Sequence, residues 1–151
     1  MDFAQRESNF KRALKLYREG CLHMAAGEFR LLIEDGSTDP RHRSYYGLML
    51  AIAEKRAQEG LRLCEQAVEE AFYDTEMYLN LAVLYFRTGR RDLASEVLLR
   101  GLRVDPKDPA LLKKISQINP RSTPALPFLN RKHVLNKYLG LARARIFHLA
   151  A

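Results

Sequence analysis

The 151-residue sequence contains no tryptophan and only two cysteines, and its longest apolar run, Tyr45 to Ala53, is nine residues. That run is about half of the roughly 18 residues that a membrane-spanning helix needs. Neither cysteine has a CxxC neighbour, so we expect reduced thiols, with Cys64 buried and Cys21 near a turn. The first residues are polar and lack a signal-peptide apolar region, so we expect a cytoplasmic location.

Motifs for catalysis and for metal or nucleotide binding are also missing. None of the four histidines is four residues from another histidine or from a cysteine, so no zinc spacing exists. The chain has no Walker loop, no GxGxxG and no GxSxG. Adjacent acids such as Glu69 and Glu70 are expected to be solvated surface rather than an acid–base pair. The sequence therefore predicts a non-enzyme with no metal site and no cofactor.

Acidic residues are absent from the last part of the chain. Residues 1–108 hold 17 Lys/Arg and 18 Asp/Glu, whereas residues 109–151 hold eight Lys/Arg and no acid. The overall charge of +7 therefore comes from the C-terminal segment.

What the sequence does contain is a pattern that recurs every 34 residues. The clearest copy consists of Tyr78, Leu81, Ala82, Tyr85, Ala94, Leu98 and Pro106. The copy 34 residues earlier has Ser44, Gly47, Leu48, Ala51, Gly60 and Cys64. The first copy has Phe10, Ala13, Leu14 and Tyr17, with Ala25 and Phe29 one residue early.

This pattern resembles the tetratricopeptide repeat, whose signature is W-x2-L-G-x2-Y, A-x3-F, P. The resemblance implies an all-α solenoid over 1–118, with repeats at about 7–40, 41–74 and 75–108 and a partial capping helix at 109–118. In the first repeat, helices are expected near 7–19 and 22–34. Thr75 is the expected N-cap of the third repeat. Gly47 is unfavourable within a helix, and we explain it by close helix–helix approach.

The remainder of the chain is predicted to have a different structure. Pro120, Pro124 and Pro127 predict an extended segment over 119–130. Residues 131–151 have apolar residues every three or four positions and predict a basic amphipathic helix. This helix could cap the solenoid, or it could dock on nucleic acid, an anionic membrane or a protein partner. The candidate contacts of this tail are Phe128, Lys132, Lys137, Arg143 and Arg145.

In the family, the first helices of the repeats line a concave groove that usually holds a peptide or a helix. The resemblance therefore implies a non-catalytic scaffold or adaptor that binds a partner there. Faces of these helices not assigned to the core predict a basic end followed by an apolar, aromatic floor. The predicted groove residues are Lys11, Lys15, Arg18, Tyr45, Met49, Ile52, Leu79, Val83, Phe86 and Arg87.

Two subclasses of the family were compared with this pattern. Chaperone co-factors hold a C-terminal carboxylate with a Lys/Asn/Arg clamp. Lys11 matches it, but Lys15, Tyr46, Glu76 and Asn80 depart from it, which argues against Hsp70 or Hsp90 tails as ligands. Small bacterial secretion chaperones share the size and repeat number and remain an alternative. The sequence leaves the partner unnamed and allows a monomer or a homodimer.

Overall fold

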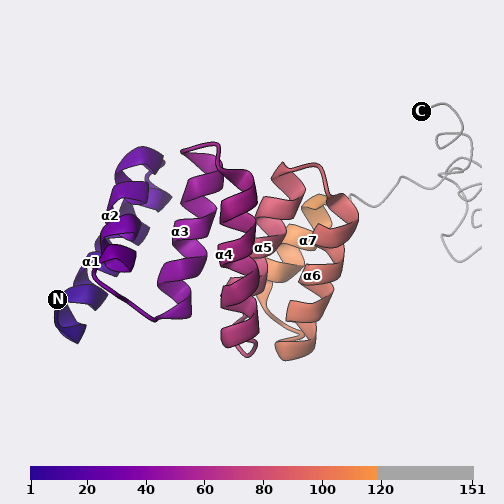
Figure 1. Cartoon of the computed structure of the whole chain (residues 1–151). Helices are drawn as coiled ribbons and strands as arrows, with labels where there is room; N and C mark the ends of the chain where they lie inside the picture. Colours follow the sequence, from indigo (N-terminus) through magenta and orange to yellow (C-terminus); the bar gives the residue numbers. More distant parts are fainter. Residues whose placement is uncertain (119–151) are drawn as a thin grey trace, which may run out of the picture. The chain divides into compact units, whose positions relative to one another are not determined.

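The computed structural model describes residues 1–118, and within them the chain forms helices and no strand (Figure 1). The helices are α1 (Phe3–Arg18), α2 (Leu22–Glu34), α3 (Pro40–Ile52), α4 (Ala57–Glu70), α5 (Thr75–Arg87), α6 (Arg91–Val104) and α7 (Pro109–Ile118). The prediction of an all-α fold is confirmed. The predictions for 119–130 and 131–151, including all five tail contacts, lie outside the described residues.

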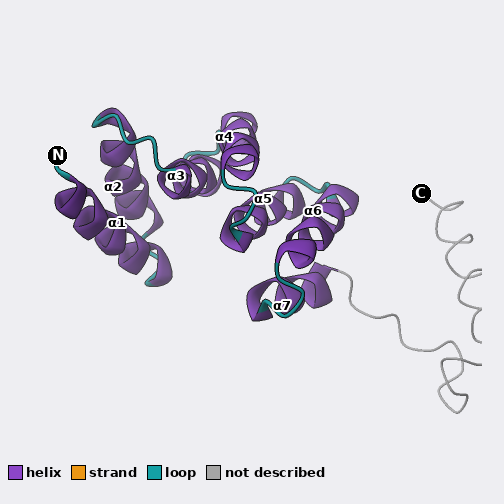
Figure 2. Ribbon diagram, turned by 90° about the horizontal axis from the view of Figure 1, so that it is seen from below, coloured by secondary structure: helices purple, strands orange, loops and turns teal. Residues whose placement is uncertain are grey.

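Consecutive helices pack as hairpins that stack side by side. Helix α1 packs on α2, α3 on α4 and α5 on α6, and each hairpin contacts the next. Helix α7 packs against both α5 and α6. Seen from below, α1, α3, α5 and α7 lie along the inner side of this row, and α2, α4 and α6 lie along the outer side (Figure 2). The inner side is where a solenoid of this kind presents a concave surface.

Aspartate side chains cap the first turns of four helices, namely α1, α3, α5 and α7. Asp2 accepts a hydrogen bond from the backbone N–H of Gln5 at 2.7 Å, so α1 begins at Phe3, four residues earlier than predicted. Asp74 caps α5 by accepting from the N–H of Glu76 at 2.9 Å. The prediction that Thr75 is the N-cap is therefore wrong. Its hydroxyl instead donates to Asp108 at 2.6 Å and ties the start of α5 to the start of α7.

The core runs along the whole row of helices and contains residues from every hairpin. Helices α3 and α4 approach each other closely where Gly47 faces Gly60. A Cβ on Gly47 would lie 2.7 Å from the Gly60 carbonyl oxygen, and a Cβ on Gly60 would lie 2.3 Å from the Gly47 oxygen. The explanation of Gly47 by close helix approach is confirmed, because neither position has room for a side chain.

The two cysteines have the environments that the sequence predicts. Both are free thiols, and Cys21 is exposed beside a turn while Cys64 is buried against α3, where its thiol donates to the Ser44 carbonyl. Burial raises the pKa of the Cys64 thiol to about 12. None of the helices in residues 1–118 is long and apolar enough to cross a bilayer.

Candidate functional site

A cleft of about 260 Å³ opens on the inner side of the helix row. Its walls come from α1, α3, α5 and α7, the helices that alternate along that side. The lining residues are Tyr17, Tyr45, Leu79, Asn80, Val83, Ala110, Lys113, Lys114 and Gln117. Four helices that are separate in sequence therefore build one concave site.

Leu79 and Val83 of α5 form the apolar floor of the cleft, and both are half-buried. Next to them, Asn80 is only 4% exposed and donates to the Ser44 hydroxyl of α3 at 3.1 Å. Tyr45 is 5% exposed, and its hydroxyl donates to the carboxylate of Glu76. These two bonds fix α3 against α5, so the floor is held in place before any ligand arrives.

The charges near the cleft are mostly positive. Burial lowers the pKa of Lys114, and the nearby positive charge of Arg87 lowers it further. Burial also raises the pKa of Tyr17, which lies close enough to Arg87 and Glu76 for both charges to act on it. Glu76 raises the pKa of Tyr45 in addition to the effect of burial. Glu76 is thus the one acid in this group, and the Tyr45 hydroxyl already donates to it.

The structure divides the predicted groove residues. Tyr45, Leu79 and Val83 line the cleft, whereas Lys11, Lys15, Arg18, Ile52, Phe86 and Arg87 do not. The prediction for Met49 is wrong: it has 0% exposure and is a core residue. Tyr45 is also almost fully buried, at 5% exposure, since helix α3 is packed by neighbours on both sides.

The basic end predicted on α1 is exposed but lies apart from the lining. The Lys11 ammonium lies 3.8 Å from a Glu7 oxygen, and Lys15 lies 3.9 Å from Glu19. These are pairs within one turn of the same helix, and such exposed pairs are worth only a few tenths of a kcal/mol. Lys11 and Lys15 are therefore solvated side chains that do not line the cleft.

Sequence reasoning missed the contribution of α7. Lys113, Lys114 and Gln117 line the cleft because Leu111 and Ile118 on another face of the helix are buried. Leu111, the partly buried Ile115 and Ile118 are spaced four and three residues apart, so the sequence could have indicated the opposite face as exposed. The spacing within α7 does not predict that this helix packs beside α5.

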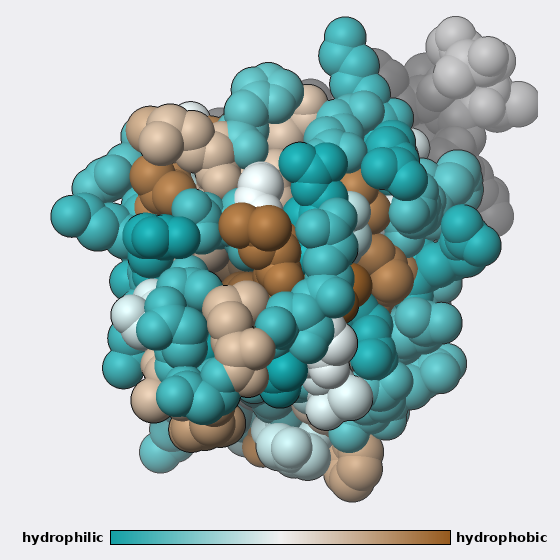
Figure 3. Space-filling model, turned by 60° about the vertical axis from the view of Figure 1, so that its left-hand side comes forward, coloured by the Kyte–Doolittle hydropathy of each residue, from teal (hydrophilic) through white to brown (hydrophobic). Residues whose placement is uncertain are grey.

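Apolar side chains are also exposed away from the cleft. Met24, Leu31 and Leu99 are more than half exposed on the outer helices α2 and α6. On the face drawn in Figure 3, hydrophobic patches are small and bordered by hydrophilic side chains. Among residues 1–118 there is no cluster of three His, Cys, Asp or Glu side chains that could hold a metal ion.

A second hollow, of about 340 Å³, lies beside His42 at the start of α3. His42 is 3% exposed, its Nδ1 lies 2.7 Å from the Ser37 hydroxyl, and its Nε2 has no hydrogen-bond partner within residues 1–118. The Phe10 ring lies against the imidazole at a centroid distance of 4.7 Å. Burial lowers the pKa of His42, and the Asp39 carboxylate, 3.8 Å from Nε2, acts in the opposite direction.

Comparison with known families identifies the fold. Residues 51–118 match the profile of the tetratricopeptide repeat, and the same hairpin architecture continues through α1 to α3. The described helices have the tetratricopeptide repeat fold. Among curated protein sequences, none matches this chain.

Solved tetratricopeptide repeat structures superpose on most of this chain. The first such domain of Spaghetti (RPAP3), bound to an HSP90 peptide, is 14% identical and matches 80% of this chain and 94% of its own, with a TM-score of 0.64. The second domain of human RPAP3, in complex with an HSP70 peptide, is 15% identical and matches 77% of this chain and 96% of its own, with a TM-score of 0.62. The Yersinia enterocolitica type III secretion chaperone SycD, in complex with a peptide of the translocator YopD, is 13% identical and matches 79% of this chain and 90% of its own, with a TM-score of 0.61. At these identities the likeness shows the fold alone.

Proposed function

We propose that this protein is a non-catalytic scaffold that binds a peptide segment of a protein partner in the cleft between α1, α3, α5 and α7. The observation that carries the proposal is the cleft itself: a preformed, partly apolar hollow whose floor is fixed by the Asn80–Ser44 and Tyr45–Glu76 hydrogen bonds. Concave apolar sites with a few fixed polar groups are where proteins bind ligands.

Relatives of the same fold support this proposal. The RPAP3 domains were solved with HSP90 and HSP70 peptides, and SycD with a peptide of YopD. The HSP90, HSP70 and YopD peptides are ligands of RPAP3 and SycD, and we do not assign them to this chain. The secretion-chaperone role and the cytoplasmic location remain predictions for this chain, as does nucleic-acid or membrane binding through residues 131–151.

The test begins with a selection of 12-residue peptides from a random display library on the full-length protein. Affinities of the selected peptides are then compared for the parent, for Leu79→Ala with Val83→Ala, and for the control Leu99→Ala on the outer side. Truncating two apolar contact residues should weaken binding by about tenfold or more, because each carries roughly 1 kcal/mol or more of contact energy. The control should leave affinity unchanged.

Circular dichroism of each variant shows whether the helices are intact. If the Leu79/Val83 variant is folded and binds the selected peptides as tightly as the parent, the cleft is not the binding site.

A further inference from the structure

Positive charge concentrates at one end of the cleft, without the acidic partners that the rest of the solenoid provides. Four side chains make up this basic rim: Arg87 at the end of α5, Arg91 at the start of α6, and Lys113 and Lys114 on α7. The Arg91 guanidinium lies 5.4 Å from the centre of the Phe86 ring, and the Lys114 ammonium lies 5.8 Å from it. Phe86 therefore holds two cations near each other beside the cleft.

Ion pairs in the described part of the chain are confined to residues 1–70. Every one of them joins residues within 1–70, from the Met1–Asp35 contact to the Arg43–Glu70 contact. None of the four cations of the basic rim forms an ion pair with an acid in residues 1–118. Four neighbouring cations without a counter-charge repel one another, so a bound anion would relieve that repulsion.

From this arrangement we infer that the cleft selects an acidic segment of a partner protein, with carboxylates at the basic rim and apolar side chains over Leu79 and Val83. The inference rests on the proposed function and adds the chemistry and the orientation of the ligand. Lys113 and Lys114 line the cleft itself, so carboxylates of a peptide lying on the floor come within reach of both. Helix α7 thereby becomes part of the binding site rather than only an end cap.

The chain's own C-terminal segment has the wrong charge to be this ligand. Residues 119–151 contain no acid, and their charged side chains are Arg121, Arg131, Lys132, Lys137, Arg143 and Arg145. Bringing them to the basic rim would add like charges to a site that already has an unbalanced excess. The same charge argument favours a separate acidic chain.

A nucleic acid also carries negative charge, but it matches the cleft less well. Leu79 and Val83 on the floor are aliphatic and suit apolar side chains of a peptide. Of the aromatic rings at the cleft, Tyr45 is 5% exposed, Tyr17 is half-buried, and Phe86 is half-buried beneath two cations, so none is a fully exposed ring on which a base could stack. A peptide with both acidic and apolar residues can contact the basic rim and the apolar floor at the same time.

The test uses the selected 12-residue peptides and the full-length protein. Each peptide is compared with a version in which every Asp and Glu is replaced by Asn and Gln, and with a synthetic peptide of residues 119–151. Fluorescence anisotropy at 50 mM and 500 mM salt gives the affinities. The acidic peptides should bind about 2- to 30-fold more tightly than their neutral versions at low salt, from two ion pairs of ordinary strength, and this advantage should shrink at high salt.

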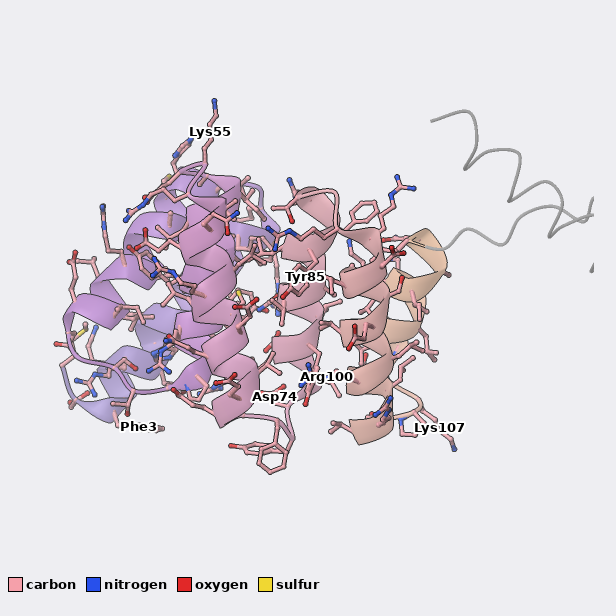
Figure 4. All side chains as sticks on the ribbon, turned by 45° about the vertical axis from the view of Figure 1, so that its right-hand side comes forward. Phe3, Lys55, Asp74, Tyr85, Arg100 and Lys107 are labelled. Atoms are coloured by element: carbon pink, nitrogen blue, oxygen red, sulfur yellow. The ribbon has the colours of Figure 1, made fainter. Side chains whose placement is uncertain are left out.

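Lys113→Ala with Lys114→Ala should remove the preference for acidic peptides while binding of the neutral versions persists. The matched control is Lys55→Ala with Lys107→Ala, which removes two exposed lysines that lie in turns outside the cleft (Figure 4). The control should keep the preference.

The outcomes separate the two proposals. Selected peptides that bind at Leu79 and Val83 but tolerate loss of their acids would overturn the acidic ligand and leave the scaffold function standing. A 119–151 peptide that competes as well as the acidic peptides, or a single-stranded oligonucleotide that does so, would also overturn it. If no peptide binds, both proposals fail.

Discussion

Replacing Gly60 with alanine should destabilise the protein, although alanine is the better helix former. A methyl group there would lie 2.3 Å from the Gly47 carbonyl oxygen and 3.2 Å from the Ala51 Cβ. Both contacts belong to helix α3, and the nearer one is a backbone atom that cannot rotate away. The two helices would have to separate by about 1 Å to restore a normal contact distance, which opens the interface along its length.

The size of the effect follows from two opposing contributions. Overpacking against a rigid neighbour costs about 1–3 kcal/mol, and a backbone contact this short places Gly60→Ala at the upper end. Replacing a helical glycine by alanine contributes about 1 kcal/mol in the other direction. We therefore expect a net loss of ~2 kcal/mol. With a urea dependence of about 2 kcal/mol per M, the unfolding midpoint should fall by about 1 M.

Gly27 provides the matched control. It lies in the middle of α2, and a Cβ built there meets nothing within 4 Å. The same substitution should therefore stabilise the protein by ~0.5–1 kcal/mol. Urea unfolding followed by circular dichroism at 222 nm measures both variants. A Gly60→Ala protein as stable as the parent would refute the close approach of α3 and α4.

Three further predictions concern single side chains. Tyr85→Phe removes the bond from the Tyr85 hydroxyl to Glu65 at 2.6 Å (Tyr85 is labelled in Figure 4) and should lower the free energy of unfolding by about 1 kcal/mol; no change in urea unfolding would mean that the bond adds nothing. With a thiol reagent at pH 8, Cys21 should react within minutes and Cys64 only on unfolding, since burial raises the pKa of Cys64 to about 12 and excludes the reagent; two fast thiols would contradict its burial. Because burial lowers the pKa of His42, the unfolded state binds more protons as pH falls through about 6.5, so stability should drop between pH 7.5 and 5.5. The slope should be smaller in His42→Phe, and an equal slope would show that His42 does not cause it.

Local features of the fold could be predicted from the sequence because short-range chemistry sets them. Helix α2 has the predicted bounds, since Gly20 takes positive φ after α1 and Gly36 takes positive φ after α2. The 34-residue spacing likewise predicted the succession of helices, because the apolar spacing within each helix is also a short-range property of the sequence. Asp2 and Asp74 show the limit of this reasoning, because the choice between adjacent capping residues depends on backbone geometry that the pattern does not contain.

The site was harder to predict because it depends on which helix faces meet. Met49 has the spacing of a groove residue, but α3 packs against α2, α4 and α5, so an apolar residue on almost any face of α3 is buried. Lys113 and Lys114 look like ordinary solvated lysines in the sequence, and only the packing of α7 beside α5 brings them to the cleft. Tertiary contacts of this kind leave no periodic signal in a single sequence.

The most direct test of peptide binding in the cleft is an NMR titration of the isotope-labelled full-length protein with the tightest selected peptide. Binding in the cleft predicts that the largest amide and methyl shifts fall on Tyr17, Leu79, Val83, Lys113 and Lys114, on the inner side of the helix row. Shifts concentrated on the outer helices α2, α4 and α6, with the inner side unchanged, would contradict the account.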